Sequence, residues 1–145
     1  MLCEEIMKRD VELVRPYDNL HTAARKMRDK GVGFLPVVDD QGKPVGTLTD
    51  RDITVRVSSQ DHRPSNVSVR EAMSPGAVTC RRWDDIHIAE NLMARNQKSR
   101  IICVDESGVL IGVISLSDIA KMEEGPRAAE VLREVAQREA HPTVV

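Results

Sequence analysis

The sequence predicts a mixed α/β fold of the α+β type, in which two β-α-β-β-α repeats pack with pseudo-two-fold symmetry. Three observations support this prediction. The chain of 145 residues repeats itself at a fixed offset of 66 positions. Each copy alternates short apolar runs with a segment of helical period. The composition, 41% hydrophobic and 30% charged, is too apolar for a disordered chain and sufficient for a sizeable core.

The internal repeat runs without gaps from position 5 to position 53. Over these 49 positions, 13 residues are identical to the residue 66 positions later. Chance would give about three, at roughly one match in 16. The identical pairs include His21 with His87, Met27 with Met93, Gly46 with Gly112, and Asp52 with Asp118. A match of this length indicates a duplicated structural unit.

Each copy contains the same five elements in the same order: a strand, an amphipathic helix, two strands joined by a tight turn, and a short helix. In the first copy these elements are expected at 11–14, 20–32, 34–39 and 44–49, and from Asp50 onward. The second copy has them 66 residues later. Neither copy of about 55 residues is expected to be stable alone, because a chain this short buries too little surface.

Two kinds of residue are expected to fix the helix start and the tight turn. Asp18 and Asp84 precede the amphipathic helices, where a carboxylate can accept hydrogen bonds from the free backbone N–H groups, so both are predicted N-caps. Gly42 and Gly108 lie between the two later strands, where a tight turn often requires a positive φ.

The repeat and its flanks divide the sequence into four segments. Repeat 1 is assigned to 1–58, a linker to 59–68, repeat 2 to 69–124, and a C-terminal helix and tail to 125–145. The linker is rich in turn-forming residues. The terminal helix carries an apolar stripe along one face, and the residues from position 141 are expected to fray. The stripe consists of Ala128, Val131, Leu132 and Val135.

Charge and aromatic content argue against several classes of function. The formal net charge is −2, and the chain holds one Phe, one Tyr and one Trp. It therefore lacks the basic surface and the aromatic stacking platform of nucleic-acid-binding modules. No apolar run reaches 18 residues and the first ten residues are charged, so neither a transmembrane helix nor a signal peptide is expected. We expect a cytoplasmic protein without a membrane partner.

The three cysteines include no CxxC pair, which favours reduced thiols. Cys80 and Cys103 align with Val14 and Val37 of the first copy, so both are predicted in the core. Cys3 lies near the terminus and is expected to be an exposed, oxidisable thiol. No Cys and His have the spacing of a zinc site, so no metal is expected.

The strongest candidate site lies in GTLTDRD (46–52) and GVISLSD (112–118). Each segment runs from a strand into the first turn of a helix, with a hydroxyl residue three positions before an acid. A carboxylate there can accept both hydroxyls of a ribose, and the free N–H groups of the helix start favour an anion. The same pattern is also a capping box, in which Thr49 or Ser115 caps the helix and the acid reaches back. The residues alone leave both interpretations open.

Signatures of enzymes are missing from the sequence. It has no P-loop, no HExxH and no nucleophile elbow. We therefore predict no catalytic residue and expect that the chain is not an enzyme.

Taken together, the motifs resemble a tandem pair of CBS domains, also called a Bateman module. The resemblance covers about residues 2–123. It rests on the paired starts Ile6–Met7 and Ala72–Met73, the LPVVDDQG run, and the Gly-hydrophobic-x-Thr/Ser-x-x-Asp ends. GVISLSDI is also similar to the last repeat of the gamma subunit of AMP-activated protein kinase. The whole chain resembles small stand-alone bacterial CBS-domain proteins.

The resemblance implies a regulatory, energy-sensing module that binds AMP, ADP, ATP or another adenosyl ligand such as S-adenosylmethionine. It places the ligand in clefts between the two repeats and implies no obligatory cofactor. The ribose and phosphate positions fall on Thr49, Arg51, Asp52, Arg100, Ser115, Ser117 and Asp118. The adenine-packing positions fall on Val11, Leu13, Val32, Ala77, Thr79 and Lys98. Phe34 takes the place of Arg100 in the first copy, so the two clefts are expected to differ in affinity.

The resemblance also implies a homodimer whose output passes to a protein effector of unknown identity. An alternative from another class is a ligand-free structural or interaction dimer, in which Asp52 and Asp118 serve as helix caps only. Nucleotide-dependent stabilisation would favour the first interpretation, and dimerisation without any ligand effect would favour the second.

Overall fold

The computed structural model describes residues 1–122 and 126–140 and divides into two compact units. The first-repeat unit contains residues 11–77 and 108–110. The second-repeat unit contains residues 1–10 and 78–107 and the described residues from 111 onward. Each unit combines helices with a three-stranded sheet, which confirms the predicted mixed fold class. The division of the sequence into repeat 1 (1–58), linker, repeat 2 (69–124) and C-terminal segment stays a prediction. The compact units follow different bounds, because the leading residues of each repeat pack with the other repeat.

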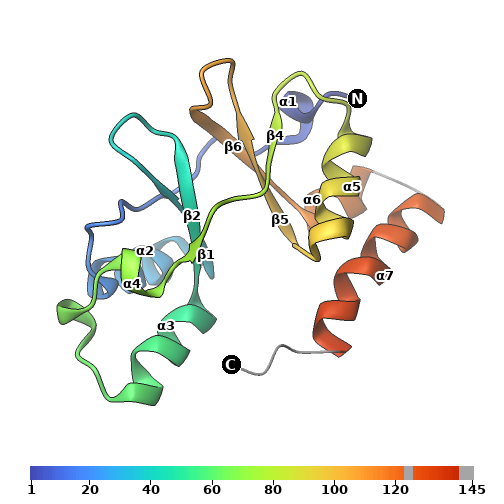
Figure 1. Cartoon of the computed structure of the whole chain (residues 1–145). Helices are drawn as coiled ribbons and strands as arrows, with labels where there is room; N and C mark the ends of the chain where they lie inside the picture. Colours follow the sequence, from blue (N-terminus) through green and yellow to red (C-terminus); the bar gives the residue numbers. More distant parts are fainter. Residues whose placement is uncertain (123–125, 141–145) are drawn as a thin grey trace. The chain divides into compact units, whose positions relative to one another are not determined.

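The sheet of the first-repeat unit has the strand order β1-β2-β3, and Figure 1 labels β1 and β2 of this sheet. Strands β1 and β2 form an antiparallel hairpin in which Phe34 pairs with Thr49. The predicted strand at 11–14 is reduced to a single parallel bridge between Val14 and Val37. The elements of this unit are α2 (Leu20–Lys30), β1 (Phe34–Val38), β2 (Pro44–Thr49), α3 (Asp50–Arg56), η1 (Ser58–Gln60), η2 (Pro64–Asn66), α4 (Val69–Ala72) and β3 (Ser74–Pro75).

The sheet of the second-repeat unit has the strand order β4-β5-β6. Here the first strand of the repeat is formed, and it pairs in parallel with β5. The long helix α7 packs beside α5, as Figure 1 shows. The elements of this unit are α1 (Cys3–Ile6), β4 (Thr79–Arg81), α5 (Ile86–Asn96), β5 (Arg100–Val104), β6 (Leu110–Ser115), α6 (Leu116–Met122) and α7 (Pro126–Ala140).

The two leading segments are exchanged between the units. Lys8, in the leading segment of the first repeat, forms an antiparallel bridge with Val113 of β6. Ser74, its equivalent 66 residues later, pairs with Thr47 of β2. The close approach of these segments requires glycine on the sheets, because a Cβ at Gly46 would lie 2.7 Å from the Ser74 carbonyl oxygen. Each sheet is therefore completed by the leading segment of the other repeat.

The helix caps lie one residue later than the sequence predicted. Asn19 and Asp85 are the N-caps of α2 and α5, and each accepts a hydrogen bond from a backbone N–H of the first turn. Asp18 instead accepts from Arg15 N at 2.8 Å, and its equivalent Asp84 likewise accepts from the backbone N–H three residues earlier. The prediction of Asp18 and Asp84 as caps was wrong, because both neighbouring positions hold residues able to cap.

Each unit buries its own hydrophobic core. The apolar positions of helical spacing point inward as predicted, although Val32 of the first copy is 41% exposed. The core of the first-repeat unit consists of Val14, Leu20, Ala23, Met27, Leu35, Val37, Leu48, Val57, Val69 and Ala72. The core of the second-repeat unit consists of Cys3, Met7, Cys80, Ile86, Ala89, Met93, Ile101, Cys103, Ile114 and Ile119.

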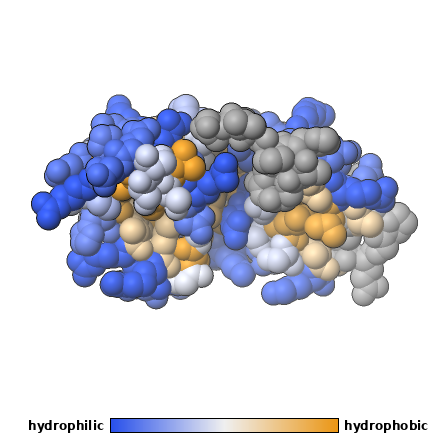
Figure 2. Space-filling model, turned by 90° about the horizontal axis from the view of Figure 1, so that it is seen from below, coloured by the Kyte–Doolittle hydropathy of each residue, from blue (hydrophilic) through white to orange (hydrophobic). Residues whose placement is uncertain are grey.

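The predicted stripe of the terminal helix is partly confirmed. Val131 and Val135 are buried, whereas Leu132 is 57% exposed. The side chain of Ala128 and residues 141–145 lie outside the described residues. Hydrophilic residues cover most of the face seen in Figure 2, where the hydrophobic residues form separate patches. Among the described helices, none has the length and apolarity that a bilayer span requires.

Candidate functional site

The β6–α6 junction holds the most completely assembled of the predicted site residues. The Ser115 backbone N–H donates to Asp118 Oδ2 at 2.9 Å, and the Asp118 N–H donates to Ser115 Oγ at 3.1 Å. This reciprocal pair is the capping box that the sequence offered as one interpretation. It holds the Asp118 carboxylate in one orientation, with only 7% of the residue exposed.

The second carboxylate oxygen of Asp118 faces a lysine that the sequence did not single out. Lys8 Nζ lies 3.4 Å from Asp118 Oδ1. The antiparallel bridge between Lys8 and Val113 brings this side chain to the junction. Burial favours the neutral carboxyl, but the hydrogen bonds with Ser115 and the Lys8 ammonium outweigh it and lower the pKa of Asp118 below the ordinary 3.8. The carboxylate is therefore ionised at neutral pH.

Hydroxyl and guanidinium groups lie at the same end of the sheet. Ser115 Oγ and Ser117 Oγ are 2.8 Å apart. The Leu116 N–H donates to the Ser99 carbonyl at 2.8 Å, which joins the start of α6 to the start of β5. Arg100 begins β5, and its Nη1 donates to Ser99 Oγ at 3.3 Å. This end of the second-repeat unit thus collects the Asp118 carboxylate, the hydroxyls of Ser99, Ser115 and Ser117, and the cationic side chains of Lys8 and Arg100.

The equivalent junction of the first-repeat unit has the same backbone and fewer cations. Asp52 Oδ2 accepts from Thr49 N at 2.9 Å, and Asp52 N donates to Thr49 Oγ1 at 3.1 Å. Arg51 is exposed beside them. Phe34 stands opposite Thr49 in the hairpin, at the position that Arg100 has in the second copy. The two junctions therefore share the capping box and differ in charge.

The predicted adenine-packing residues fall into both units. Those assigned to the first copy stay together in the first-repeat unit, where Val11 and Leu13 are half-buried and Val32 is exposed. Those assigned to the second copy are divided: Ala77 ends the first-repeat unit, while Thr79 and Lys98 belong to the second-repeat unit. Their role in binding stays a prediction.

The expectation for Cys3 was wrong, because the residue is fully buried in the second-repeat unit. Helix α1 turns its side chain toward Cys80 and Cys103, which are buried as predicted. Proximity to the terminus misled the prediction, since the first residues of the chain dock on this unit. Within residues 1–122 and 126–140, no group of three His, Cys, Asp or Glu side chains has an arrangement suited to a metal ion.

Comparison with protein families identifies the duplicated unit. The CBS domain model matches the chain twice, at residues 3–59 and 69–125. The chain belongs to the CBS domain family. The two matches cover most of the 145 residues, so the chain carries a tandem CBS pair, as the resemblance implied.

Curated relatives of this CBS pair differ in length. The CBS domain-containing protein YhcV of Bacillus subtilis is 36% identical over 117 residues, which are 81% of each chain. A Methanopyrus kandleri protein, MK0525, is 33% identical over 119 residues, and the match spans 82% of this chain but 61% of that relative. The gamma-3 subunit of human 5'-AMP-activated protein kinase is 32% identical over 117 residues, or 77% of this chain and 24% of the subunit.

Solved structures superpose on most of the chain. Hypoxic Response Protein I, solved with two coordinated zinc ions, has a TM-score of 0.76 at 27% identity, covering 86% of this chain and all of that one. CBSX2, solved with AMP, has a TM-score of 0.71 at 22% identity, over 83% and 94% of the two chains. The CBS pair of MJ0100, solved with 5'-methylthioadenosine and S-adenosylmethionine, has a TM-score of 0.73 at 21% identity, over 84% and 94%.

Proposed function

We propose that this CBS pair is a non-enzymatic regulatory module that senses an adenine nucleotide or another adenosyl ligand. The observation that carries the proposal is the Asp118 carboxylate, which is ionised, held by Ser115 and placed 3.4 Å from the Lys8 ammonium. A carboxylate in a fixed orientation can accept hydrogen bonds from two vicinal ribose hydroxyls. Cations and hydroxyls at the same end of the sheet suit the phosphate groups of a nucleotide.

Each residue of the Asp118 site has a distinct part in the proposed complex. The ribose hydroxyls donate to Asp118, mainly to Oδ1, because Oδ2 already accepts from the Ser115 N–H. Lys8 then turns from the carboxylate to a phosphate oxygen, together with Arg100 and the hydroxyls of Ser115 and Ser117. A ligand that binds one arrangement of these side chains better shifts the conformational population that a partner protein senses.

The solved relatives support the class of ligand. CBSX2 was solved with AMP, and the MJ0100 pair with two adenosyl compounds. The shared chemical group of these ligands is adenosine, so the proposal names an adenosyl ligand without choosing a phosphate number. Contact of the ligand with both repeats and the expected homodimer stay predictions of the sequence resemblance.

The two junctions are proposed to differ in affinity. The equivalent of Lys8 in the second copy of the leading segment is Ser74, and the equivalent of Arg100 in the first repeat is Phe34. The Asp52 junction therefore lacks equivalents of both Lys8 and Arg100, and Arg51 is the cation beside it. We assign the tighter binding to Asp118 and weak or no binding to Asp52.

The alternative function, a ligand-free interaction dimer, is favoured by one observation. The capping boxes account for the positions of Asp52 and Asp118 without any ligand. Thermal unfolding with AMP, ATP and S-adenosylmethionine distinguishes the two functions. A bound ligand at 100 times its Kd raises the free energy of unfolding by about 2.7 kcal/mol. We expect Asp118→Asn to abolish the stabilisation and the matched Asp52→Asn to keep it. A dimer whose Tm responds to none of these ligands would establish the alternative.

A further inference from the structure

Three buried thiols meet beneath the N-terminal segment of the second-repeat unit. Cys80 of β4 and Cys103 of β5 are register partners on adjacent parallel strands. Their Sγ atoms are 3.2 Å apart. Cys3 of helix α1 lies against both, within hydrogen-bonding reach of each thiol. None of the three residues is more than 2% exposed.

We propose that Cys80 and Cys103 are an oxidisable dithiol that closes to a disulfide, and that docking of the N-terminal segment (Met1–Lys8) controls access to it. Adjacent strands lie about 4.8 Å apart, which is inside the Cα separation that disulfides usually span, about 4.4–6.8 Å. The two Sγ atoms have to approach by about 1 Å to form a bond. The backbone register therefore allows the disulfide without rearrangement of the sheet.

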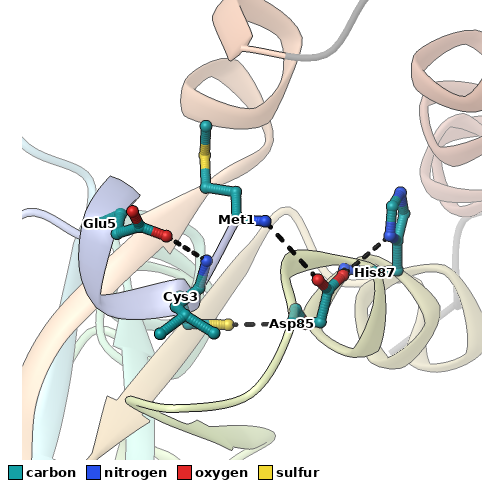
Figure 3. Close-up of polar contacts among 6 residues, drawn as sticks. Met1, Cys3, Glu5, Asp85 and His87 are labelled. Atoms are coloured by element: carbon teal, nitrogen blue, oxygen red, sulfur yellow. Dashed lines mark hydrogen bonds and ion pairs between the residues drawn. The ribbon is translucent and has the colours of Figure 1, made fainter.

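Helix α1 covers the dithiol through polar contacts that join Cys3 and Glu4 to the residues between β4 and α5. The Cys3 N–H donates to the Asp84 carbonyl at 2.8 Å, and the Glu4 N–H donates to the Arg82 carbonyl at 3.0 Å. Glu4 Oε2 also lies 2.8 Å from Arg82 Nε. Figure 3 shows Cys3 beside Asp85, whose carbonyl lies 3.9 Å from the Cys3 Sγ. Opening of this segment exposes Cys3 and Met7 of the core, so it is a partial unfolding whose free energy lies below that of unfolding the whole unit.

The docked segment also suppresses ionisation of the two strand cysteines, whereas hydrogen bonds with Cys103 and Cys80 lower the pKa of its own Cys3 to about 4. The hydrogen bond with Cys3 and burial raise the pKa of Cys103 to about 12. The hydrogen bond with Cys103 and burial raise the pKa of Cys80 as well. Because the thiolate is the reactive form, the covered pair resists oxidation. When the segment lifts, the Cys3 hydrogen bond and much of the burial are lost, so the thiols ionise more readily and oxidant can enter.

The oxidation balances with a hydroperoxide as the oxidant. In the opened state one thiolate of the pair attacks a peroxide oxygen; the O–O bond breaks and the sulfur becomes a sulfenic acid. The second thiol attacks that sulfur, the S–S bond forms, and the sulfenic oxygen leaves as water. With hydrogen peroxide, two thiols lose two electrons and two water molecules are formed. Cys3 remains a thiol.

The first test is disulfide mapping of the full chain after treatment with hydrogen peroxide. Trypsin cleaves between all three cysteines, since Lys8, Arg81 and Arg100 separate their peptides. We expect a linked pair of peptides containing Cys80 and Cys103 and an alkylated Cys3. A disulfide that contains Cys3, a link between two chains, or three free thiols where a reference dithiol is fully oxidised would each overturn the proposal. This test uses no ligand, so it stands apart from the proposed sensing function.

The second test addresses the control of access. Glu4→Gln removes the ion pair with Arg82. A surface ion pair contributes up to about 1 kcal/mol, so its loss should raise the population of the opened state, and with it the rate of disulfide formation, about two- to fivefold. Glu130→Gln, an exposed charge change on α7, should leave the rate unchanged. Cys103→Ala should abolish the linked peptide in a protein whose circular dichroism matches the unmodified chain. Equal rates for Glu4→Gln and Glu130→Gln would overturn the role of the segment.

Discussion

Lys8 and Asp118 belong to different repeats and meet with 3.4 Å between Lys8 Nζ and Asp118 Oδ1. The contact exists because the leading segment of the first repeat docks on the last strand of the second, through the bridge between Lys8 and Val113. A cation thus stands beside the carboxylate that is the proposed ribose acceptor. The duplication does not reproduce this contact, since Ser74 takes the equivalent position.

We expect Lys8→Ser to weaken AMP binding by about tenfold to a hundredfold, because a hydrogen bond from a charged group contributes about 1.5–3 kcal/mol. S-adenosylmethionine has no phosphate, so its affinity should change much less. Isothermal titration calorimetry measures both. Lys43→Ser, an exposed lysine in the β1–β2 turn, is the matched control. An equal loss for both ligands would show that Lys8 does not contact the phosphate.

The capping boxes predict a stability effect that needs no ligand. Ser115→Ala removes the hydroxyl that accepts from Asp118 N and should lower the free energy of unfolding by about 1 kcal/mol. The exposed Ser117 hydroxyl contacts the Ser115 hydroxyl and makes no other hydrogen bond among those described. Ser117→Ala should therefore lower the free energy of unfolding by less than about 0.5 kcal/mol. Urea unfolding of the two variants measures the difference. Equal effects would mean that the box adds nothing to the start of α6.

The pKa of Asp118 predicts how stability depends on acid. Because the folded-state pKa lies below the ordinary 3.8, the carboxylate contributes stability in full above that value. The contribution is lost as the pH falls through the lower, folded-state pKa. The Tm difference between the unmodified chain and Asp118→Asn should therefore be constant from pH 7 to about pH 5 and shrink below about pH 4. A difference that grew on acidification would mean that the carboxyl is destabilising when ionised.

The order of elements and most of the core could be predicted, because both depend on local hydrophobic period. Leu20 and Met27 are two turns apart on the same face of α2, and both are buried. The helix caps were misplaced by one residue, since Asp18 and Asn19 can both cap and only the backbone decides between them. The sequence predicted the capping boxes at both junctions, but it did not decide whether their carboxylates also bind a ligand. Lys8 was missed, because no local pattern indicates that the chain start pairs with β6 and its equivalent, Ser74, carries no charge.

The exchanged segments make one further prediction, at Gly46. A Cβ added there would lie 2.7 Å from the Ser74 carbonyl oxygen, a backbone atom that the β2–β3 pairing holds in place. Gly46→Ala should therefore push β3 from the sheet and lower the free energy of unfolding by about 1–3 kcal/mol, as overpacking does. Differential scanning calorimetry should show a Tm lower by about 4 °C or more. At Gly33 the nearest atom to an added Cβ is Asp50 Oδ2, at 2.9 Å, on an exposed side chain that can move. Gly33→Ala is thus the matched control, and a Tm loss as large as that of Gly46→Ala would mean that close approach to the exchanged segment is not the reason for glycine at position 46.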